Sequence, residues 1–253
     1  GIIIENNYIK AELNYNTAIK LDSSNYNAYN RRAILYGFYL GEKEKGIDDC
    51  NKAITLNPAF AKPYINRATL LGDIGKNEES LADFSIGIKI DPNQPIAYLN
   101  RGTLYKDLER YEEAIDDYTK CLELYPTYVD KKKAYYNRHL SYIEIGQYEN
   151  ALKDINKLID LEPNDAFYRK AKGSLFYWEL KKYDEAITNF NKAIELYQSI
   201  DYHPIDVYRY CGYAHYQLQE YEKAEIMISE AIKIAEDIWI GEDRMYIVPL
   251  YEY

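Results

Sequence analysis

Apolar and small side chains recur along this chain with the spacing of one face of a helix. Residues 95–128 contain two such stripes, each with members at positions i, i+4 and i+7. The first stripe consists of Tyr98, Gly102 and Tyr105, and the second of Ala114, Tyr118 and Cys121. A break near Glu109 separates the stripes, and Pro126 follows the second, where a proline ends a helix. The pattern predicts two short amphipathic helices joined by a tight turn.

The same two-stripe unit repeats on both sides of this segment. Pro58, Pro92 and Pro126 follow one another at intervals of 34 residues. The expected copies cover residues 26–60, 61–94, 95–131, 132–165, 166–204 and 205–235. Residues 1–24 fit the second helix of a truncated repeat, and residues 236–253 fit a C-terminal tail or the start of a further helix. In the copy at 166–204, the small residue of the first stripe is either Gly173 or Ser174.

A single hairpin of this kind cannot bury both of its stripes. The hairpins are therefore expected to stack in sequence order and to form an all-α solenoid. Small residues at Ala33, Ala68 and Gly102 allow each first helix to approach its second helix closely. His139 takes this place in the fourth copy, where we expect wider packing.

Two segments of the third copy resemble the tetratricopeptide repeat. Residues 97–105, Ala-Tyr-Leu-Asn-Arg-Gly-Thr-Leu-Tyr, are similar to the first helix of that family, and residues 112–118, Glu-Glu-Ala-Ile-Asp-Asp-Tyr, to its second. The resemblance extends over about residues 8–235, and the register kept by six copies makes it specific. It implies a right-handed α-α superhelix whose concave side is lined by the first helices.

Charge and composition exclude several classes of protein. The chain has 253 residues, a net charge of −10 and a hydrophobic share of 47%, which is enough for a packed core. An acidic chain does not suit the phosphate backbone of nucleic acid. No apolar run approaches the roughly 20 residues that cross a bilayer, so membrane insertion is not expected. No signal-peptide pattern opens the sequence, and three cysteines do not suggest a disulfide framework, which favours the cytoplasm without fixing the compartment.

The catalytic and metal-binding residue types do not form a constellation with known chemistry. Cys50, Cys121 and Cys211 occupy packing positions in the helical stripes. Cys211 and His215 lie at i and i+4, but a structural zinc needs four nitrogen or sulfur ligands and no second pair follows. The acidic pair Asp116–Asp117 is expected on the solvated side of its helix. The sequence therefore predicts no enzyme, no cofactor and no metal site.

The resemblance implies a binding groove along the first helices. The sixth position of three successive copies holds Asn66, Asn100 and Asn137. An asparagine amide there can donate to and accept from the backbone of an extended peptide, and alternatively it can satisfy a neighbouring helix or loop. The expected groove residues are Asn66, Thr69, Asn100, Thr103, Tyr136, Asn137, Leu140, Trp178, Arg209, Tyr213 and Tyr216.

The groove positions of the C-terminal half are rich in aromatic residues. Tyr, Trp and Arg are frequent anchors in protein interfaces, and Trp178, Tyr213 and Tyr216 occupy such positions. Tyr168 and Leu175 are assigned to the same surface. The alternative is that several of these side chains fill the core between repeats.

A chaperone-type carboxylate clamp is not expected. In the resembled family, that clamp grips the C-terminal carboxylate of a chaperone with lysine, asparagine and arginine side chains in a fixed order over three copies. Lys62 and Lys133 occupy second positions here, but no series of copies supplies the complete basic set. The two-cation grip of a charge-assisted carboxylate site is therefore missing.

These features together predict a non-catalytic scaffold that binds a peptide or helix of a partner protein in its concave groove. Two alternatives stay open. The array is either the substrate-recruiting repeat arm of a larger enzyme, or a structural module that self-associates through its ends or its C-terminal tail.

Overall fold

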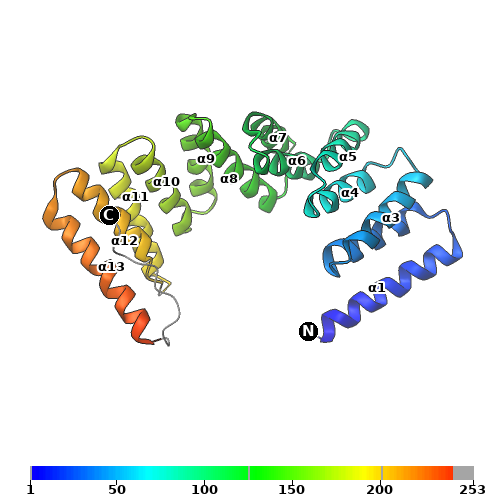
Figure 1. Ribbon diagram of the computed structural model, residues 1–253, viewed down its shortest axis with the longest axis horizontal. Helices are drawn as coiled ribbons and strands as arrows, with labels where there is room; N and C mark the ends of the chain where they lie inside the picture. Colours follow the sequence, from blue (N-terminus) through cyan, green and yellow to red (C-terminus); the bar gives the residue numbers. More distant parts are fainter. Residues whose placement is uncertain (1, 125, 201, 242–253) are drawn as a thin grey trace. The chain divides into compact units, whose positions relative to one another are not determined.

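The computed structural model of this chain describes residues 2–124, 126–200 and 202–241. Thirteen α-helices and one π-helical turn make up the regular structure of these residues (Figure 1). The chain divides into two compact units, residues 1–141 and 142–253. The prediction of an all-α architecture built from helix hairpins is confirmed, and the right-handed sense of a superhelix stays a prediction.

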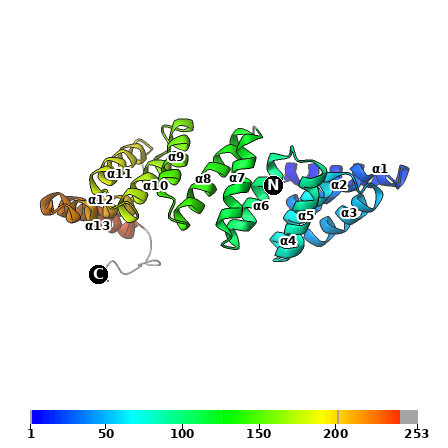
Figure 2. The same ribbon diagram turned by 90° about the horizontal axis from the view of Figure 1, so that it is seen from above.

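Unit 1 holds three complete hairpins of the described chain. Its elements are α1 (Ile2–Leu21), α2 (Tyr26–Ile34), the π-helical turn η1 (Leu35–Tyr39), α3 (Lys43–Leu56), α4 (Ala61–Asp73), α5 (Asn77–Ile90), α6 (Pro95–Asp107), α7 (Tyr111–Glu123) and most of α8 (Tyr128–Glu144). The hairpins are α2–α3, α4–α5 and α6–α7. The first packs against the second through α3 and α4, and the second against the third through α5 and α6 (Figure 2).

Unit 2 repeats this arrangement. Its elements are α9 (Tyr148–Leu161), α10 (Ala166–Trp178), α11 (Tyr183–Gln198), α12 (Ile205–Gln217) and α13 (Tyr221–Gly241). The hairpins α10–α11 and α12–α13 stack through the contact between α11 and α12. Residues 236–241 continue helix α13, whereas residues 242–253 of the expected tail lie outside the described residues.

The predicted stripes form the interior of each hairpin. Tyr118 and Cys121 of α7 are completely buried, and Tyr98 of α6 is 8% exposed. A Cβ atom on Gly102 would lie 3.0 Å from atom Cε1 of the Tyr118 ring, so the absence of a side chain lets α6 pack this close to α7. The apolar periodicity of the sequence thus determines which face of each helix is inside.

The register of the copy at 166–204 is decided by Gly173. A Cβ atom on Gly173 would lie 2.7 Å from the Phe190 ring, whereas Ser174 is half-buried beside this contact. Gly173 therefore holds the small-residue position in α10. In this register Tyr168 and Leu175 belong to the interior, where they are 8% and 2% exposed. Their assignment to the groove is wrong, and the alternative that they fill the core is correct.

The first complete copy carries one extra residue between its small-residue position and its second helix. The backbone N–H of Leu40 donates to the carbonyl of Leu35 at 3.0 Å, which is the i to i+5 bond of a π-helix. The extra residue is thus absorbed by η1 at the end of the first helix. The loop between η1 and α3 is therefore no longer than the loop between α4 and α5. Ala33 stays fully buried against the second helix.

An arginine on each of the first helices α2, α4 and α6 links three helices. Each guanidinium donates twice to an aspartate of the second helix in its own copy, over 2.6–2.7 Å. It donates a third time to a polar side chain of the preceding helix, over 2.5–3.1 Å. The three sets are Arg32 with Asp49 and Asn16, Arg67 with Asp83 and Asn51, and Arg101 with Asp117 and Ser85.

The placement of Asp117 on a solvated helix face is wrong. Asp117 is 5% exposed, and burial raises the pKa of its carboxyl group, while Arg101 acts in the opposite direction. Its neighbour Asp116 is exposed, as expected. The sequence pattern predicts the same solvated environment for both carboxylates, because it does not show that Arg101 bonds to only one of them.

Candidate functional site

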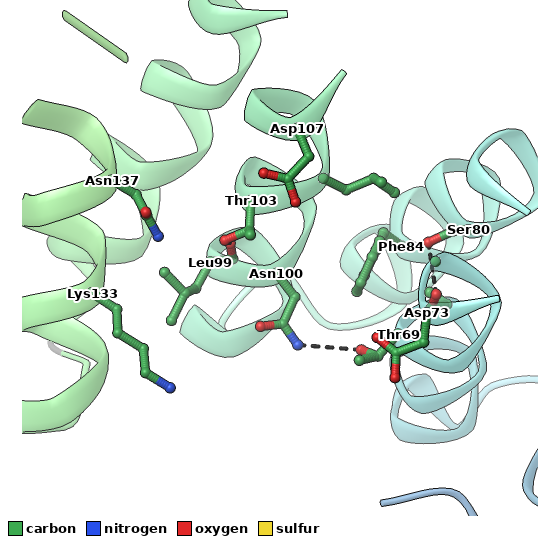
Figure 3. A pocket seen from close by; sticks show the side chains of 13 residues that line it. Thr69, Asp73, Ser80, Phe84, Leu99, Asn100, Thr103, Asp107, Lys133 and Asn137 are labelled. Carbon is green, nitrogen blue, oxygen red and sulfur yellow. Dashed lines mark hydrogen bonds between the residues drawn. The ribbon is translucent and has the colours of Figure 1, made fainter. Parts of the chain in front are cut away.

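A pocket of about 360 Å³ opens beside the first helices of three successive copies in unit 1 (Figure 3). We call it the first-helix pocket. It is lined by Ala68, Thr69, Gly72 and Asp73 of α4, by Ser80 and Phe84 of α5, by Leu99, Asn100, Thr103, Leu104 and Asp107 of α6, and by Lys133 and Asn137 of α8.

Helix periodicity places the polar lining residues. Thr69 and Asp73 lie one turn apart on α4, Thr103 and Asp107 lie one turn apart on α6, and Lys133 lies one turn before Asn137 on α8. The small residues that precede Thr69 and Thr103 pack against the second helices. Because these small residues fix the rotation of each first helix, the next residue of each helix lines the pocket.

The asparagine amides of two copies link neighbouring first helices. Nδ2 of Asn100 donates to Oγ1 of Thr69 at 3.2 Å, as the dashed line in Figure 3 shows. Nδ2 of Asn66 donates to Oδ1 of Asn30 at 2.9 Å, and Asn30 is 4% exposed. One amide hydrogen of each asparagine is therefore taken by a neighbouring helix, in agreement with the alternative left open from the sequence. Asn66 does not line the pocket.

Asn137 and Lys133 differ from these two amides. Within the described residues, the Asn137 side chain makes no hydrogen bond and the Lys133 ammonium makes no ion pair. In Figure 3 both side chains extend from α8 on the side that faces α6. Asn137 is half-buried and Lys133 is exposed, so this helix offers an unoccupied amide and an unoccupied cation at the pocket.

Two carboxylates stand on the α4 and α6 side of the pocket. Asp73 Oδ2 lies 3.2 Å from Nζ of Lys43, and Asp107 Oδ1 lies 3.3 Å from Nζ of Lys106. Both aspartates are exposed, so these ion pairs are readily exchanged for others. The pocket is thus acidic beside α4 and α6 and basic beside α8.

The structure brings together four of the predicted groove residues, Thr69, Asn100, Thr103 and Asn137. Tyr136 and Leu140 are half-buried on α8 and are not among the lining residues. The Tyr136 ring stacks on the ring of His139, with 6.2 Å between the centroids.

The remaining predicted residues lie in unit 2. Trp178, Tyr213 and Tyr216 are 47%, 41% and 60% exposed. The Trp178 ring meets the Tyr210 ring edge-on, with 5.9 Å between centroids, and the Arg209 guanidinium lies 5.3 Å from the centroid of the same Tyr210 ring. Unit 2 therefore presents large exposed aromatic side chains on its first helices, and the half-buried ring of Tyr210 packs against one of them.

Sequence reasoning missed the two carboxylates of the pocket and the role of Lys133 in it. Asp73 and Asp107 occupy the same position in copies that are 34 residues apart. A comparison of every position across the copies contains this signal.

The three cysteines are buried thiols, and the buried His215 is paired with a glutamate. Cys50, Cys121 and Cys211 are free and fully buried, and burial raises the pKa of each thiol to about 12. His215 Nδ1 lies 2.6 Å from Glu220 Oε2. Among the residues that the structure describes, no group of three or more His, Cys, Asp or Glu side chains could hold a metal ion. No helix in the described ranges has the length and apolar character needed to cross a membrane.

Models of the tetratricopeptide repeat match most of the chain. The matched residues are 26–60, 95–128, 132–165 and 174–237. The chain belongs to the tetratricopeptide repeat family. Proteins of this family are protein-interaction modules, which agrees with the helix hairpins and with the pocket on the first helices. No curated protein sequence matches the chain.

Several solved tetratricopeptide repeat structures are similar to this member of the family. YrrB, a repeat protein with an unusual peptide-binding site, is 27% identical, with a TM-score of 0.62 over 74% of this chain and 93% of YrrB. MamA from Desulfovibrio magneticus RS-1 is 20% identical, with a TM-score of 0.60 over 70% of this chain and 96% of MamA. The C-terminal part of a repeat protein from Cytophaga hutchinsonii is 17% identical, with a TM-score of 0.75 over 95% of this chain and 96% of that structure.

Proposed function

We propose that this tetratricopeptide repeat protein is a non-catalytic scaffold that binds an extended peptide segment of a partner protein in the first-helix pocket. The unoccupied amide of Asn137, at a pocket shared by three successive first helices, carries the proposal. An amide that has both a donor and an acceptor can pair with one peptide group of an extended chain. The peptide-binding site of YrrB supports this class of ligand.

The charges of the pocket orient the peptide. Asp73 and Asp107 attract a basic side chain beside α4 and α6, and Lys133 attracts an acidic side chain beside α8. Asn100 keeps its side-chain oxygen and one amide hydrogen for the peptide after its bond to Thr69. The ligand is thus a segment with a basic and an acidic residue separated by a short extended stretch.

The same charges disfavour a C-terminal carboxylate as the ligand. Lys133 is the one cationic side chain among the lining residues, and two aspartates stand in the same pocket. A free carboxylate would gain one charge-assisted contact and would be repelled by both aspartates. We therefore propose an internal peptide segment, with nucleic acid excluded by the same aspartates and the net charge.

The exposed aromatic residues of unit 2 provide further contacts for a partner. Trp178, Tyr213 and Tyr216 belong to first helices, as the pocket residues of unit 1 do. Aromatic side chains of this kind are enriched among the residues that dominate binding free energy. Arg209 contributes a cation at the same surface.

A peptide selection tests the proposal. Peptides are selected on the whole chain from a random display library, and the dissociation constants of the best binders are measured by fluorescence anisotropy. Asn137→Ala is expected to weaken binding about tenfold, because the peptide group opposite Asn137 is left without its partner. Lys133→Gln is expected to weaken binding and to reduce its dependence on salt.

The matched control is Lys52→Gln on α3, an exposed lysine that does not line the pocket. It is expected to bind every selected peptide as the unchanged protein does. If Asn137→Ala and Lys133→Gln also bind all of the peptides with unchanged affinity, the first-helix pocket is not the binding site.

A further inference from the structure

A second pocket of unit 1, with a volume of about 670 Å³, lies between α3, α4 and α5. We call it the Leu71 pocket. Its apolar lining consists of Ile47, Leu71, Ile74 and Ala82, of which Ile74 is 37% exposed. The guanidinium of Arg67 also lines it, next to the ion pair of Arg67 with Asp83. None of its lining residues belongs to the first-helix pocket.

The neighbouring copies fill the equivalent place with a tyrosine. Tyr36, Leu71 and Tyr105 occupy the same position, three residues after the small residues Ala33, Ala68 and Gly102. The hydroxyl of Tyr36 donates to Glu12 of α1 at 2.8 Å. The centroid of the Tyr105 ring lies 5.7 Å from the guanidinium of Arg101 and 4.5 Å from that of Arg110. Leu71 has no ring to place there, and the volume stays open.

The copy that carries Leu71 nevertheless keeps the cations that lie beside the tyrosine ring in the neighbouring copies. Arg32 and Arg101 each lie within 6 Å of the centroids of two tyrosine rings. Arg67, at the same position, has the ring of Tyr64 on one side, at 5.8 Å, and among the described residues no second ring. Lys76 stands where the next copy has Arg110, and it also lines the pocket. The pocket therefore combines an aliphatic wall with two cations placed for the face of an aromatic ring.

We propose that the Leu71 pocket binds an aromatic side chain of a partner peptide, which takes the place of the missing tyrosine. Asn16 of α1 and Asn51 of α3 occupy equivalent positions, because each accepts a hydrogen bond from the arginine of the following first helix. Four residues earlier, Ile47 therefore occupies the position of Glu12, which accepts the hydrogen bond of the Tyr36 hydroxyl. A ring without a hydroxyl group therefore fits the pocket, and phenylalanine is the preferred residue.

The rim of the pocket specifies the neighbours of this phenylalanine. Glu44 and Asp48 are exposed, and neither makes an ion pair within the described residues. Lys76 is already paired with Glu79 at 3.2 Å, and Arg67 with Asp83 at 2.6 Å, so the rim carries two uncompensated negative charges. A lysine or arginine beside the phenylalanine complements these charges. The partner is thus a peptide with an aromatic residue flanked by basic ones.

The test uses the whole chain with isotope-labelled methyl groups. The peptide acetyl-Lys-Phe-Lys-amide is added while the methyl signals of Ile47, Leu71 and Ile74 are followed by NMR. We expect saturable shifts of these three signals. The peptides acetyl-Lys-Ala-Lys-amide and acetyl-Glu-Phe-Glu-amide are each expected to need about tenfold higher concentrations. Equal binding of all three peptides would overturn the proposal.

Two variants at one position separate occupation of the pocket from loss of folding. Leu71→Tyr restores the ring of the neighbouring copies, and it is expected to abolish the peptide-induced shifts at Ile47 and Ile74 while the melting temperature is kept or raised. Leu71→Met conserves the side-chain volume and is expected to leave binding unchanged. Unchanged binding by folded Leu71→Tyr would contradict the proposal.

The remaining controls distinguish this pocket from other sites and occupants. Asn137→Ala is expected to leave these shifts unchanged, so failure of the first-helix pocket as a peptide site does not affect this result. Shifts of the same methyl groups that depend on protein concentration without any peptide would mean that a second copy of the chain occupies the pocket, and would overturn the assignment to a partner peptide.

Discussion

Arg101 shows how a single side chain can hold three helices of this repeat array. Its guanidinium pairs twice with Asp117 of α7 and donates to Ser85 of α5 at 3.1 Å. The centroids of the Tyr98 and Tyr105 rings lie 5.9 Å and 5.7 Å from it. Such a bidentate contact has the geometry that a planar guanidinium matches best. The same three hydrogen bonds recur at Arg32 and Arg67, so this contact is repeated in three copies of unit 1.

The substitution Asp117→Asn tests how much this contact contributes to the free energy of unfolding. It is expected to lower the free energy of unfolding by about 1–3 kcal/mol, because the half-buried guanidinium loses its counter-charge and a bidentate acceptor. The measurement is urea unfolding followed by circular dichroism. Asp116→Asn, the exposed neighbour, is the control and is expected to change the stability by less than about 0.5 kcal/mol. Equal effects of the two substitutions would show that the pair contributes nothing specific.

At the scale of the element, each hairpin turn depends on one residue in the left-handed backbone conformation. Gly41, Gly75 and Gly146 have φ angles of 73°, 80° and 72°, and Glu109, Lys181 and Gln219 have φ angles of 59°, 53° and 61°. A residue with a Cβ atom is strained in this region, whereas glycine is not. Three of the six turns therefore carry a conformational cost that the other three avoid.

The substitutions Gly75→Ala and Gln219→Gly are expected to have opposite effects. Gly75→Ala should lower the free energy of unfolding by about 1 kcal/mol, and Gln219→Gly should raise it by up to about 1 kcal/mol, because each changes the strain at a positive φ angle. Thermal unfolding by calorimetry measures both.

The control for these turn substitutions is Gln217→Gly, two residues earlier in helix α12. Gln217 is the last residue of this helix and has no positive φ angle, so glycine relieves no strain there and only adds backbone freedom to the unfolded chain. This variant should lower the free energy of unfolding by up to about 1 kcal/mol. A stabilising effect of Gln217→Gly, or a destabilising effect of Gln219→Gly, would refute the explanation by turn strain.

At the scale of the molecule, stability is built from contacts between neighbouring elements. Within each unit, the main helix contacts of the described residues join helices that follow one another directly or with one helix between them. In arrays of this kind the free energy is approximately a sum of terms for each repeat and for each interface. A substitution that destabilises one hairpin should therefore promote unfolding of that hairpin and leave distant hairpins unchanged.

Gly173→Val tests this local behaviour. The added side chain meets the Phe190 ring, 2.7 Å from the position of the new Cβ atom, and overpacking of this kind costs about 1–3 kcal/mol. Hydrogen exchange followed by mass spectrometry is expected to accelerate in α10 and α11 and to stay unchanged in α4 and α5. Ser174→Ala is the control and should leave all four helices unchanged. Equal acceleration in α4, α5, α10 and α11 would contradict a stability built from neighbouring contacts.

The sequence by itself determined the helix hairpins, their order and the buried side of each helix. Stripes such as Ala114, Tyr118 and Cys121 are local patterns, and burial of apolar side chains acts on them regardless of what lies farther along the chain. The sequence also led to Thr69, Asn100, Thr103 and Asn137, because the register of the copies fixes which residues follow each small one.

Only the tertiary structure decided which partners the individual polar groups have and where a pocket forms. Asp116 and Asp117 are neighbours of the same charge, and only the packing of α6 on α7 gives one of them to Arg101. The amides of Asn66 and Asn137 have the same place in the repeat, but among the described residues only the first donates to an acceptor, on Asn30. Leu71 fits an apolar pattern as well as tyrosine does, so the pocket beside Arg67 is visible only once the neighbouring helices are in place. Local periodicity records which side chains are apolar, whereas partners and cavities depend on distances between helices that no local pattern contains.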